Sequence, residues 1–341
     1  MKKNIFKNTI LYFSVIALFL LGCGNATSAI AQEEGTAMFP LELYSEANSV
    51  SLEEALGEPM VPLAGDPKAA VIQAPQASGK VVYTSSGNND VTMDASNSAD
   101  GYIMVKYTGS ASVKLKLILS GPSGIKYTYN LNSNGNYETF ILSNGSGNYT
   151  VGVYKNIVDT KYSTLFTKSF QVTLKDEFAP FLRPNQYVNF NANSQVVTMA
   201  ASLVKDSKND IEKVQSIYDY VVKNITYDKQ LAQTVQSGYV PVVDDVLMNK
   251  KGICFDYAAV MAAMLRSQGI PTKLVTGYTG SAYHAWISTY SKETGWVEGI
   301  IFFDGTTWRL MDPTFASTGN SSDAIMKYIG DGKNYQEKYL Y

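Results

Sequence analysis

The sequence contains very little cysteine and histidine. Its 341 residues include two cysteines, Cys23 and Cys254, and a single histidine, His284. Cys23 ends an apolar N-terminal segment, so Cys254 has no obvious intramolecular partner and a disulfide framework is not expected. A zinc site built from cysteine and histidine would have only Cys254 and His284 as ligands, which is too few. We therefore expect no metal and no organic cofactor.

Charged residues are also few, at 17% of the chain, and the formal net charge is −2. No basic stripe of the kind that nucleic-acid binding needs is visible, so nucleic acid is excluded as a partner. Tyrosine is abundant, with 24 residues, and glycine, serine, threonine and asparagine are common in the first half. This composition is typical of exposed β-structure on a cell surface.

The N-terminus has an apolar run too short to span a membrane comfortably. It extends from Ile10 to Leu21, follows basic residues, and has the length of a signal-peptide core. The motif Leu20-Leu21-Gly22-Cys23 resembles the lipobox of bacterial lipoproteins. The resemblance implies that residues 1–22 are a signal peptide, that Cys23 is lipidated, and that the protein is anchored at the extracytoplasmic face of the cell membrane. The alternative is an ordinary secretory signal cleaved after Ala29-Ile30-Ala31.

Residues 23–79 are expected to form a flexible tether, because alanine, glutamate, proline and glycine recur along them. Ser51 and Glu54 form a capping-box pattern for one short helix, which Gly57 would end. The tether would hold the following domains away from the membrane.

Residues 80–176 contain short segments in which apolar and polar residues mostly alternate, separated by clusters of glycine, serine and asparagine. This alternation predicts an antiparallel β-sandwich of Ig-like type. No catalytic cluster is visible in it, so we expect a spacer or a surface-binding domain. The expected strands are 101–107, 112–119, 125–129, 137–142, 148–154 and 168–174.

A proline-containing boundary at 177–185 precedes a second domain, expected at 185–341. Asn209 and Glu212 predict the start of a helix, and apolar residues at helical spacing continue it to Ile225. The polar stretch from there to about Asp245 is expected to be a loop.

Cys254 is expected at the start of a buried helix. The following residues to Arg266 are rich in alanine, methionine and leucine, and Gly269 and Pro271 mark the end of the helix. At a helix N-terminus the unpaired backbone N–H groups favour a thiolate over a thiol, and they can also stabilise an oxyanion.

Strands are expected to follow this helix at 272–278 and 283–290, and a hairpin at 299–303 and 306–311. His284 and Trp286 would share one face of the second strand, and Asp312 would end the hairpin. A helix start that carries cysteine, followed by strands that carry histidine and aspartate, can supply a nucleophile, a base and a group that orients the base.

A series of short motifs runs through this part of the chain. They are Gly252-Ile-Cys254-Phe-Asp-Tyr-Ala258, Arg266-Ser-Gln-Gly-Ile-Pro271, Gly277-Tyr278, His284-Ala-Trp286 and Trp308-Arg-Leu-Met-Asp312-Pro-Thr314, with Ile225-Thr-Tyr-Asp228 upstream. Taken together, these motifs resemble the core of the transglutaminase-like superfamily over about residues 200–318. The resemblance implies a papain-like α+β fold with Cys254 as nucleophile, His284 as base and Asp312 as its orienting partner. The family usually has a further side chain that helps the oxyanion. Tyr227 and Gln230 are candidates for it, and the sequence also leaves Gln233 and Gln236 open.

The leading hypothesis is an extracytoplasmic thiol enzyme that acts on amide or peptide bonds through an acyl-enzyme. An amine acceptor would give transglutaminase chemistry, and water would give a cysteine protease or amidase. The substrate would be a protein or peptide, with cell-wall peptide among the options. The alternatives are a non-catalytic surface module that uses the fold as a scaffold, and a cell-wall-associated assembly or adhesion protein.

Overall fold

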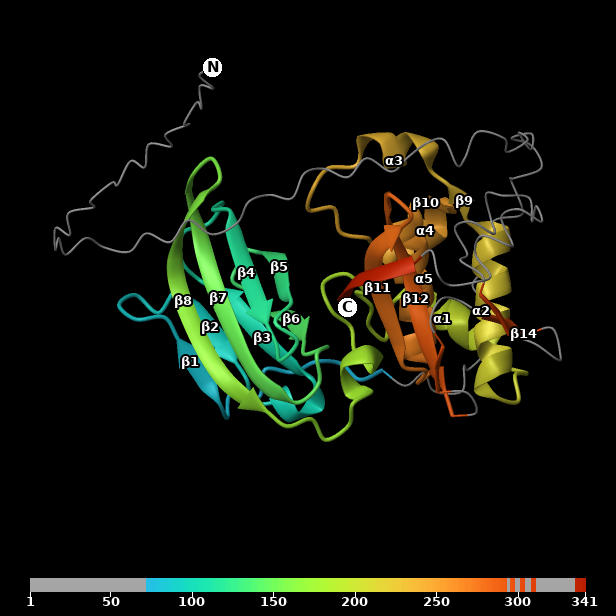
Figure 1. Cartoon of the computed structure of the whole chain (residues 1–341), viewed down its shortest axis with the longest axis horizontal. Coiled ribbons are helices and arrows are strands. Elements are labelled where there is room, and N and C mark those ends of the chain that lie inside the picture. Colours follow the sequence, from blue (N-terminus) through green and yellow to red (C-terminus); the bar gives the residue numbers. More distant parts are fainter. Residues whose placement is uncertain (1–71, 293–294, 298–300, 304–307, 311–334) are drawn as a thin grey trace, which may run out of the picture.

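The computed structural model describes residues 72–292, 295–297, 301–303, 308–310 and 335–341, which form a β-domain and an α/β domain side by side (Figure 1). The expected signal peptide, most of the expected tether, Cys23 and Asp312 lie outside these residues. In the part of the chain that is described, no helix has the length and apolar character needed to cross a membrane.

The β-domain has two antiparallel sheets of four strands, ordered β1-β2-β3-β6 and β5-β4-β7-β8. Their buried faces share one apolar core, so we call this domain the β-sandwich. The finer Ig-like assignment stays a prediction. The strands of the first sheet are β1 (Val82–Thr84), β2 (Val91–Asp94), β3 (Tyr102–Tyr107) and β6 (Glu138–Ile141), and those of the second are β4 (Leu115–Ser120), β5 (Lys126–Leu131), β7 (Gly147–Val158) and β8 (Lys161–Val172).

Strict alternation explains why β4 and β5 were predictable. Every second residue of β5 is buried, while the residues between them are exposed. Strands β1 and β2 were not predicted, because three or four residues are too few to show a period of two. Strand β8 begins earlier than expected. A tight turn at Asp159, with φ of 50°, reverses the chain at the end of β7, and β8 pairs antiparallel with β7 directly after it.

The α/β domain begins with helices. Asn209 caps α2 by accepting a hydrogen bond from Glu212 N at 2.9 Å, as the sequence predicts. The expectation of a loop up to Asp245 is wrong: Asp228 accepts from Leu231 N at 2.9 Å and starts the short helix α3 there, and α4 follows. The helices are α1 (Gln195–Leu203), α2 (Asp210–Asn224), α3 (Lys229–Thr234), α4 (Val243–Asn249) and α5 (Cys254–Ser267), with 3-10 turns at Ser98–Asp100 and Ala179–Leu182.

The sheet of this domain has the order β13-β12-β11-β16, and its strands pair antiparallel. The predicted hairpin is present as the antiparallel pair β14 and β15, and β9 pairs with β10 in parallel. The strands are β9 (Thr226–Tyr227), β10 (Lys251–Gly252), β11 (Thr272–Thr279), β12 (Ala282–Ser291), β13 (Gly295–Val297), β14 (Ile301–Phe303), β15 (Trp308–Leu310) and β16 (Tyr335–Leu340).

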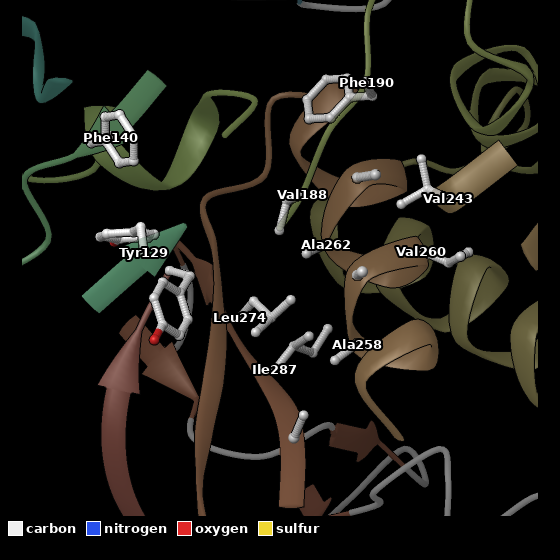
Figure 2. Close-up of a cluster of buried hydrophobic side chains, with 14 of the residues drawn as sticks. Tyr129, Phe140, Val188, Phe190, Val243, Ala258, Val260, Ala262, Leu274 and Ile287 are labelled. Carbon is white, nitrogen blue, oxygen red and sulfur yellow. The ribbon is translucent and has the colours of Figure 1, made fainter. Parts of the chain in front are cut away.

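Helix α5 is the centre of this core. All of its residues except Phe255 are buried, and small alanines let the sheet approach closely. Figure 2 shows Leu274 of β11 and Ile287 of β12 beside Ala258 and Ala262 of α5. The position of α5 is therefore set by packing on all sides, which fixes the place of its first residue, Cys254.

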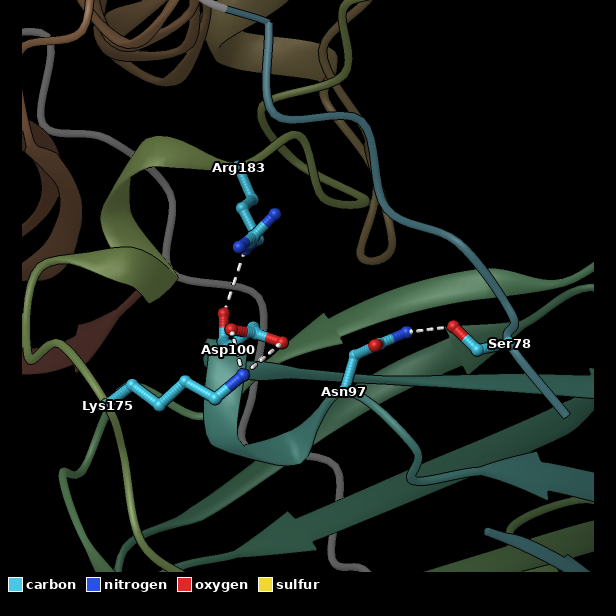
Figure 3. Close-up of polar contacts among 5 residues, drawn as sticks. All are labelled: Ser78, Asn97, Asp100, Lys175 and Arg183. Atoms are coloured by element: carbon cyan, nitrogen blue, oxygen red, sulfur yellow. Dashed lines mark hydrogen bonds and ion pairs between the residues drawn. The ribbon is translucent and has the colours of Figure 1, made fainter. Parts of the chain in front are cut away.

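The linker between the domains is tied to both of them. Lys175 Nζ lies 3.1 Å from Asp100 Oδ1, and Arg183 Nε donates to Asp100 O at 2.8 Å (Figure 3). The Arg183 guanidinium also lies 4.9 Å from the centre of the Tyr102 ring. On the other side, Arg183 O accepts a hydrogen bond from Arg266 Nη1 of α5 at 2.8 Å.

Gly277 marks a place where the backbones of β11 and β16 approach closely. A Cβ at this position would lie 2.0 Å from Gln336 O and 2.9 Å from Trp286 Cη2. We expect Gly277→Ala to lower the free energy of unfolding by about 2–3 kcal/mol, because overpacking would push β16 away. Urea unfolding followed by circular dichroism measures this change, and a loss below about 0.5 kcal/mol would contradict it.

Candidate active site

Cys254 is the first residue of α5, as the sequence predicts, and its side chain is 1% exposed. Asp256 N and Tyr257 N already donate to Ile253 O, at 2.9 and 3.1 Å. The backbone N–H groups of Cys254 and Phe255 therefore precede the first turn of hydrogen bonds, where a helix offers donors to an anion.

The buried carboxylate of Asp256 caps the N-terminus of α5. Asp256 Oδ2 accepts from Ile253 N at 2.8 Å, and Asp256 Oδ1 accepts from Tyr239 Oη at 2.7 Å. Gly252 allows the approach, since a Cβ there would lie 2.6 Å from Asp256 Cβ. Asp256 thus accepts the hydrogen bond of the Ile253 N–H. The N–H groups of Cys254 and Phe255 remain available to the Cys254 thiol.

Burial raises the pKa of Asp256 above its usual 3.8, and the negative charge of Asp228 acts in the same direction. The hydrogen bonds from Ile253 N and Tyr239 lower this pKa, but burial outweighs them. The ionised carboxylate therefore costs stability above its folded-state pKa, and this cost disappears below about pH 4.

This shift gives a pH-dependent prediction for Asp256→Asn. As the pH rises from about 4 to the raised folded-state pKa of Asp256, the wild-type protein should lose stability relative to the variant, because its carboxyl ionises first in the unfolded state and the variant has no carboxyl to titrate there. Urea unfolding of both proteins across this range tests the sign. Parallel curves would show that Asp256 does not titrate in this window.

His284 lies in β12, directly opposite Gly277 of β11, and is 3% exposed. Its ring stacks with that of Trp286, with centroids 6.2 Å apart, which agrees with the expected shared face. The alternate residues Ala285 and Ile287 belong to the apolar core that α5 covers.

Helix α5 and the first part of β11, which pairs with β12, have similar lengths. Helix α5 has 14 residues and spans about 20 Å. The chain then reverses at Gly269 into β11, and the five steps from Thr272 to Gly277 cover about 17 Å. Helix α5 packs against both β11 and β12, so the elements that carry Cys254 and His284 are neighbours in the domain. Asp312 lies outside the described residues, so its role stays a prediction.

The two oxyanion candidates occupy different environments. Tyr227 is half-buried in β9 and pairs with Gly252 of β10, two residues before Cys254. Gln230 and Gln233 are exposed on α3, and Gln236 is exposed in the loop that follows it. Position thus favours Tyr227 over the glutamines.

Comparison with known proteins bears on this arrangement. Residues 197–299 match the model of the transglutaminase-like superfamily. These residues form a transglutaminase-like domain. The match includes Cys254 and His284 and ends before Asp312.

Curated relatives of the transglutaminase-like domain are distant. The chain is 29% identical over 171 residues to the uncharacterised YebA protein of Bacillus subtilis, covering 44% of this chain and 22% of that one. It is 26% identical over 120 residues to the kyphoscoliosis peptidase of Mus musculus (35% and 18%). It is 36% identical over 70 residues to a protein-glutamine gamma-glutamyltransferase of Pseudomonas aeruginosa (16% and 10%). The chain thus spans less than a quarter of each of these relatives.

Solved structures resemble the chain only weakly. The periplasmic domain of TgpA from Pseudomonas aeruginosa has a TM-score of 0.33 at 16% identity, over 75% of this chain and 81% of that one. Red sea bream transglutaminase has a TM-score of 0.29 at 14% identity, over 69% and 55%. The assignment of the transglutaminase-like domain therefore rests on the family model.

Tyr239 and Asp256 contact the start of α5 but are not among the site residues that the sequence predicts. Asp256 stands three residues after Ile253, where an acidic side chain can reach back to the N-cap N–H, so a local signal was present. Tyr239 lies 17 residues from Asp256 and carries no such signal.

Proposed function

We propose that this protein is a thiol enzyme that cleaves an amide or peptide bond and forms an acyl-enzyme on Cys254. The observation that carries the proposal is that the transglutaminase-like domain places Cys254 at the N-terminus of a buried helix. Strand β12, which packs against this helix, bears His284 near its start.

The chemistry follows from these two groups. The Cys254 thiolate attacks the carbonyl carbon, and the oxyanion forms beside the backbone N–H groups of Cys254 and Phe255. Protonated His284 gives its proton to the leaving amine as the C–N bond breaks, which leaves a thioester. Water or an acceptor amine then gives a proton to His284 and attacks the thioester, and the thiolate is restored. In this proposal Asp312 orients His284, and Tyr227 assists the oxyanion.

Analysis of the reaction products distinguishes water from an amine as the acceptor. The full chain is incubated with a glutamine-containing peptide, with and without a primary amine, and the products are weighed by mass spectrometry. Amine incorporation supports acyl transfer, whereas cleavage or deamidation supports hydrolysis. Products that persist in Cys254→Ala would refute the proposal.

Burial of both side chains favours a second candidate, a non-catalytic surface module. A thiol and an imidazole that are 1% and 3% exposed meet substrate only after a local opening. Alkylation of native protein by iodoacetamide near neutral pH separates the candidates. A Cys254 thiol that is inert, and stays inert in His284→Ala, supports the module.

The location of the protein is proposed from Cys23. A lipidated Cys23 would hold the enzyme at the outer face of a bacterial membrane, where a protein or cell-wall peptide would be its substrate. Metabolic labelling with a fatty-acid probe tests the anchor. Label that is absent from the wild type, or that survives Cys23→Ser, would refute it.

A further inference from the structure

The β-sandwich contacts the start of α5 through a row of aromatic rings. Tyr129 of β5 stacks with Tyr187 of the α/β domain, with centroids 5.7 Å apart. Tyr187 in turn lies 5.4 Å from Phe255, the residue after Cys254. The row thus extends from the core of the sandwich to the second residue of the nucleophile helix.

A second set of contacts between the β-sandwich and α5 passes through the loop between α3 and α4. Gly238 of this loop lies against Asn130 of β5, since a Cβ on Gly238 would be 2.6 Å from Asn130 Nδ2. The φ of Gly238 is 87°, a conformation that favours glycine. Asn130 is on the exposed side of its strand, so the sandwich meets the loop with a surface residue.

Tyr239, the next residue of the loop, contacts α5. Tyr239 Oη donates to Asp256 Oδ1 at 2.7 Å, and Asp256 Oδ2 accepts from Ile253 N at 2.8 Å. The sandwich, the loop and the N-cap of α5 therefore form one continuous chain of contacts that ends beside Cys254. A β-sandwich that served only as a spacer would need neither set of contacts with α5.

We propose that the β-sandwich positions the N-terminus of α5, with Tyr239 and Asp256 as the positioning residues. They hold the peptide before Cys254, so that the N–H of Cys254 faces the developing oxyanion. This inference rests on the proposed function. A misplaced oxyanion donor weakens the transition state more than the bound substrate, so the effect should appear in kcat rather than in KM.

The experiment uses the full chain and 4-nitrophenyl acetate, which acylates a reactive thiol and releases nitrophenolate. We expect Tyr239→Phe and Asp256→Ala to lower kcat per titrated thiol about tenfold, with KM within about twofold. Asp256→Asn should keep most of the rate, because its amide can accept from Ile253 N and donate to Tyr239 Oη.

A matched pair tests the contribution of the sandwich. Asn130→Ala should lower kcat severalfold, whereas Thr128→Ala, two residues earlier on the same exposed side of β5, should leave it unchanged. The melting temperature of each variant is measured alongside. The inference is overturned if Tyr239→Phe keeps the full kcat, if Asn130→Ala behaves like Thr128→Ala, or if every loss of rate follows a loss of folded protein.

A failure of the proposed function would give a different result from a failure of the positioning inference. A wild-type protein that releases nitrophenolate no faster than Cys254→Ala refutes the enzyme itself, and the positioning inference falls with it. An active wild type with unaffected variants refutes the positioning alone.

Discussion

His284→Ala is expected to lower the rate at which Cys254 is acylated by about 10³-fold or more. A positioned acid–base group contributes about 10² to 10⁴ to such a step, and His284 is the only histidine in the sequence. No other imidazole in the chain can take its place. Nitrophenolate release from 4-nitrophenyl acetate measures the acylation rate, and its pH profile supplies a second readout. In the variant the part of the pH dependence that belongs to His284 should disappear.

Ser288→Ala is the control for this substitution. Ser288 lies on β12, on the same face as His284, and is fully buried. In the described part of the protein its hydroxyl has no hydrogen-bond partner, so the variant should be as stable as the wild type or slightly more stable. It should also keep the acylation rate. An equal loss of rate in both variants would mean that His284 serves packing rather than proton transfer.

Arg266→Met is expected to lower the free energy of unfolding by about 3–5 kcal/mol. The guanidinium is fully buried and donates to three backbone oxygens. These are Thr272 O at 2.8 Å, Arg183 O at 2.8 Å and Tyr341 O at 2.5 Å. Burial lowers the pKa of Arg266 to about 9, so the group remains charged at neutral pH.

The size of this effect comes from the carbonyls that the variant leaves behind. Methionine fills much of the volume but donates nothing, so all three buried acceptors lose the guanidinium donor at once, and Tyr341 O keeps only Leu274 N, at 2.9 Å. The three oxygens belong to β11, the interdomain linker and the residue after β16, so the loss should also loosen the contact between the domains. Urea unfolding measures the change.

Lys205→Met is the matched control, because Lys205 is exposed. It should change stability by less than about 0.5 kcal/mol. Arg266→Lys should also be destabilising, since an ammonium group cannot reach three carbonyls in the planar geometry of a guanidinium. A loss below about 1 kcal/mol in Arg266→Met would contradict the role assigned to this residue.

Local patterns explain what the sequence could predict about the fold. Alternation gave β4 and β5, Asn209 and Glu212 marked the start of α2, and Gly269 and Pro271 marked the end of α5. Helices α3 and α4 were missed because six or seven residues carry too little periodicity. Whether Asp312 acts on His284 stays a prediction.

By itself, the sequence determined the two kinds of domain, the transglutaminase-like motifs, and the position of Cys254 as the first residue of its helix. Each of these depends on residues that are neighbours in the chain, so spacing and capping signals reveal them. Only the tertiary structure decided what surrounds that helix. Tyr239 reaches Asp256 across 17 positions, and Arg266 reaches Arg183 and Tyr341 across 83 and 75. Hydrogen bonds across such separations form only when packing brings the groups together, and no local pattern in the chain encodes them.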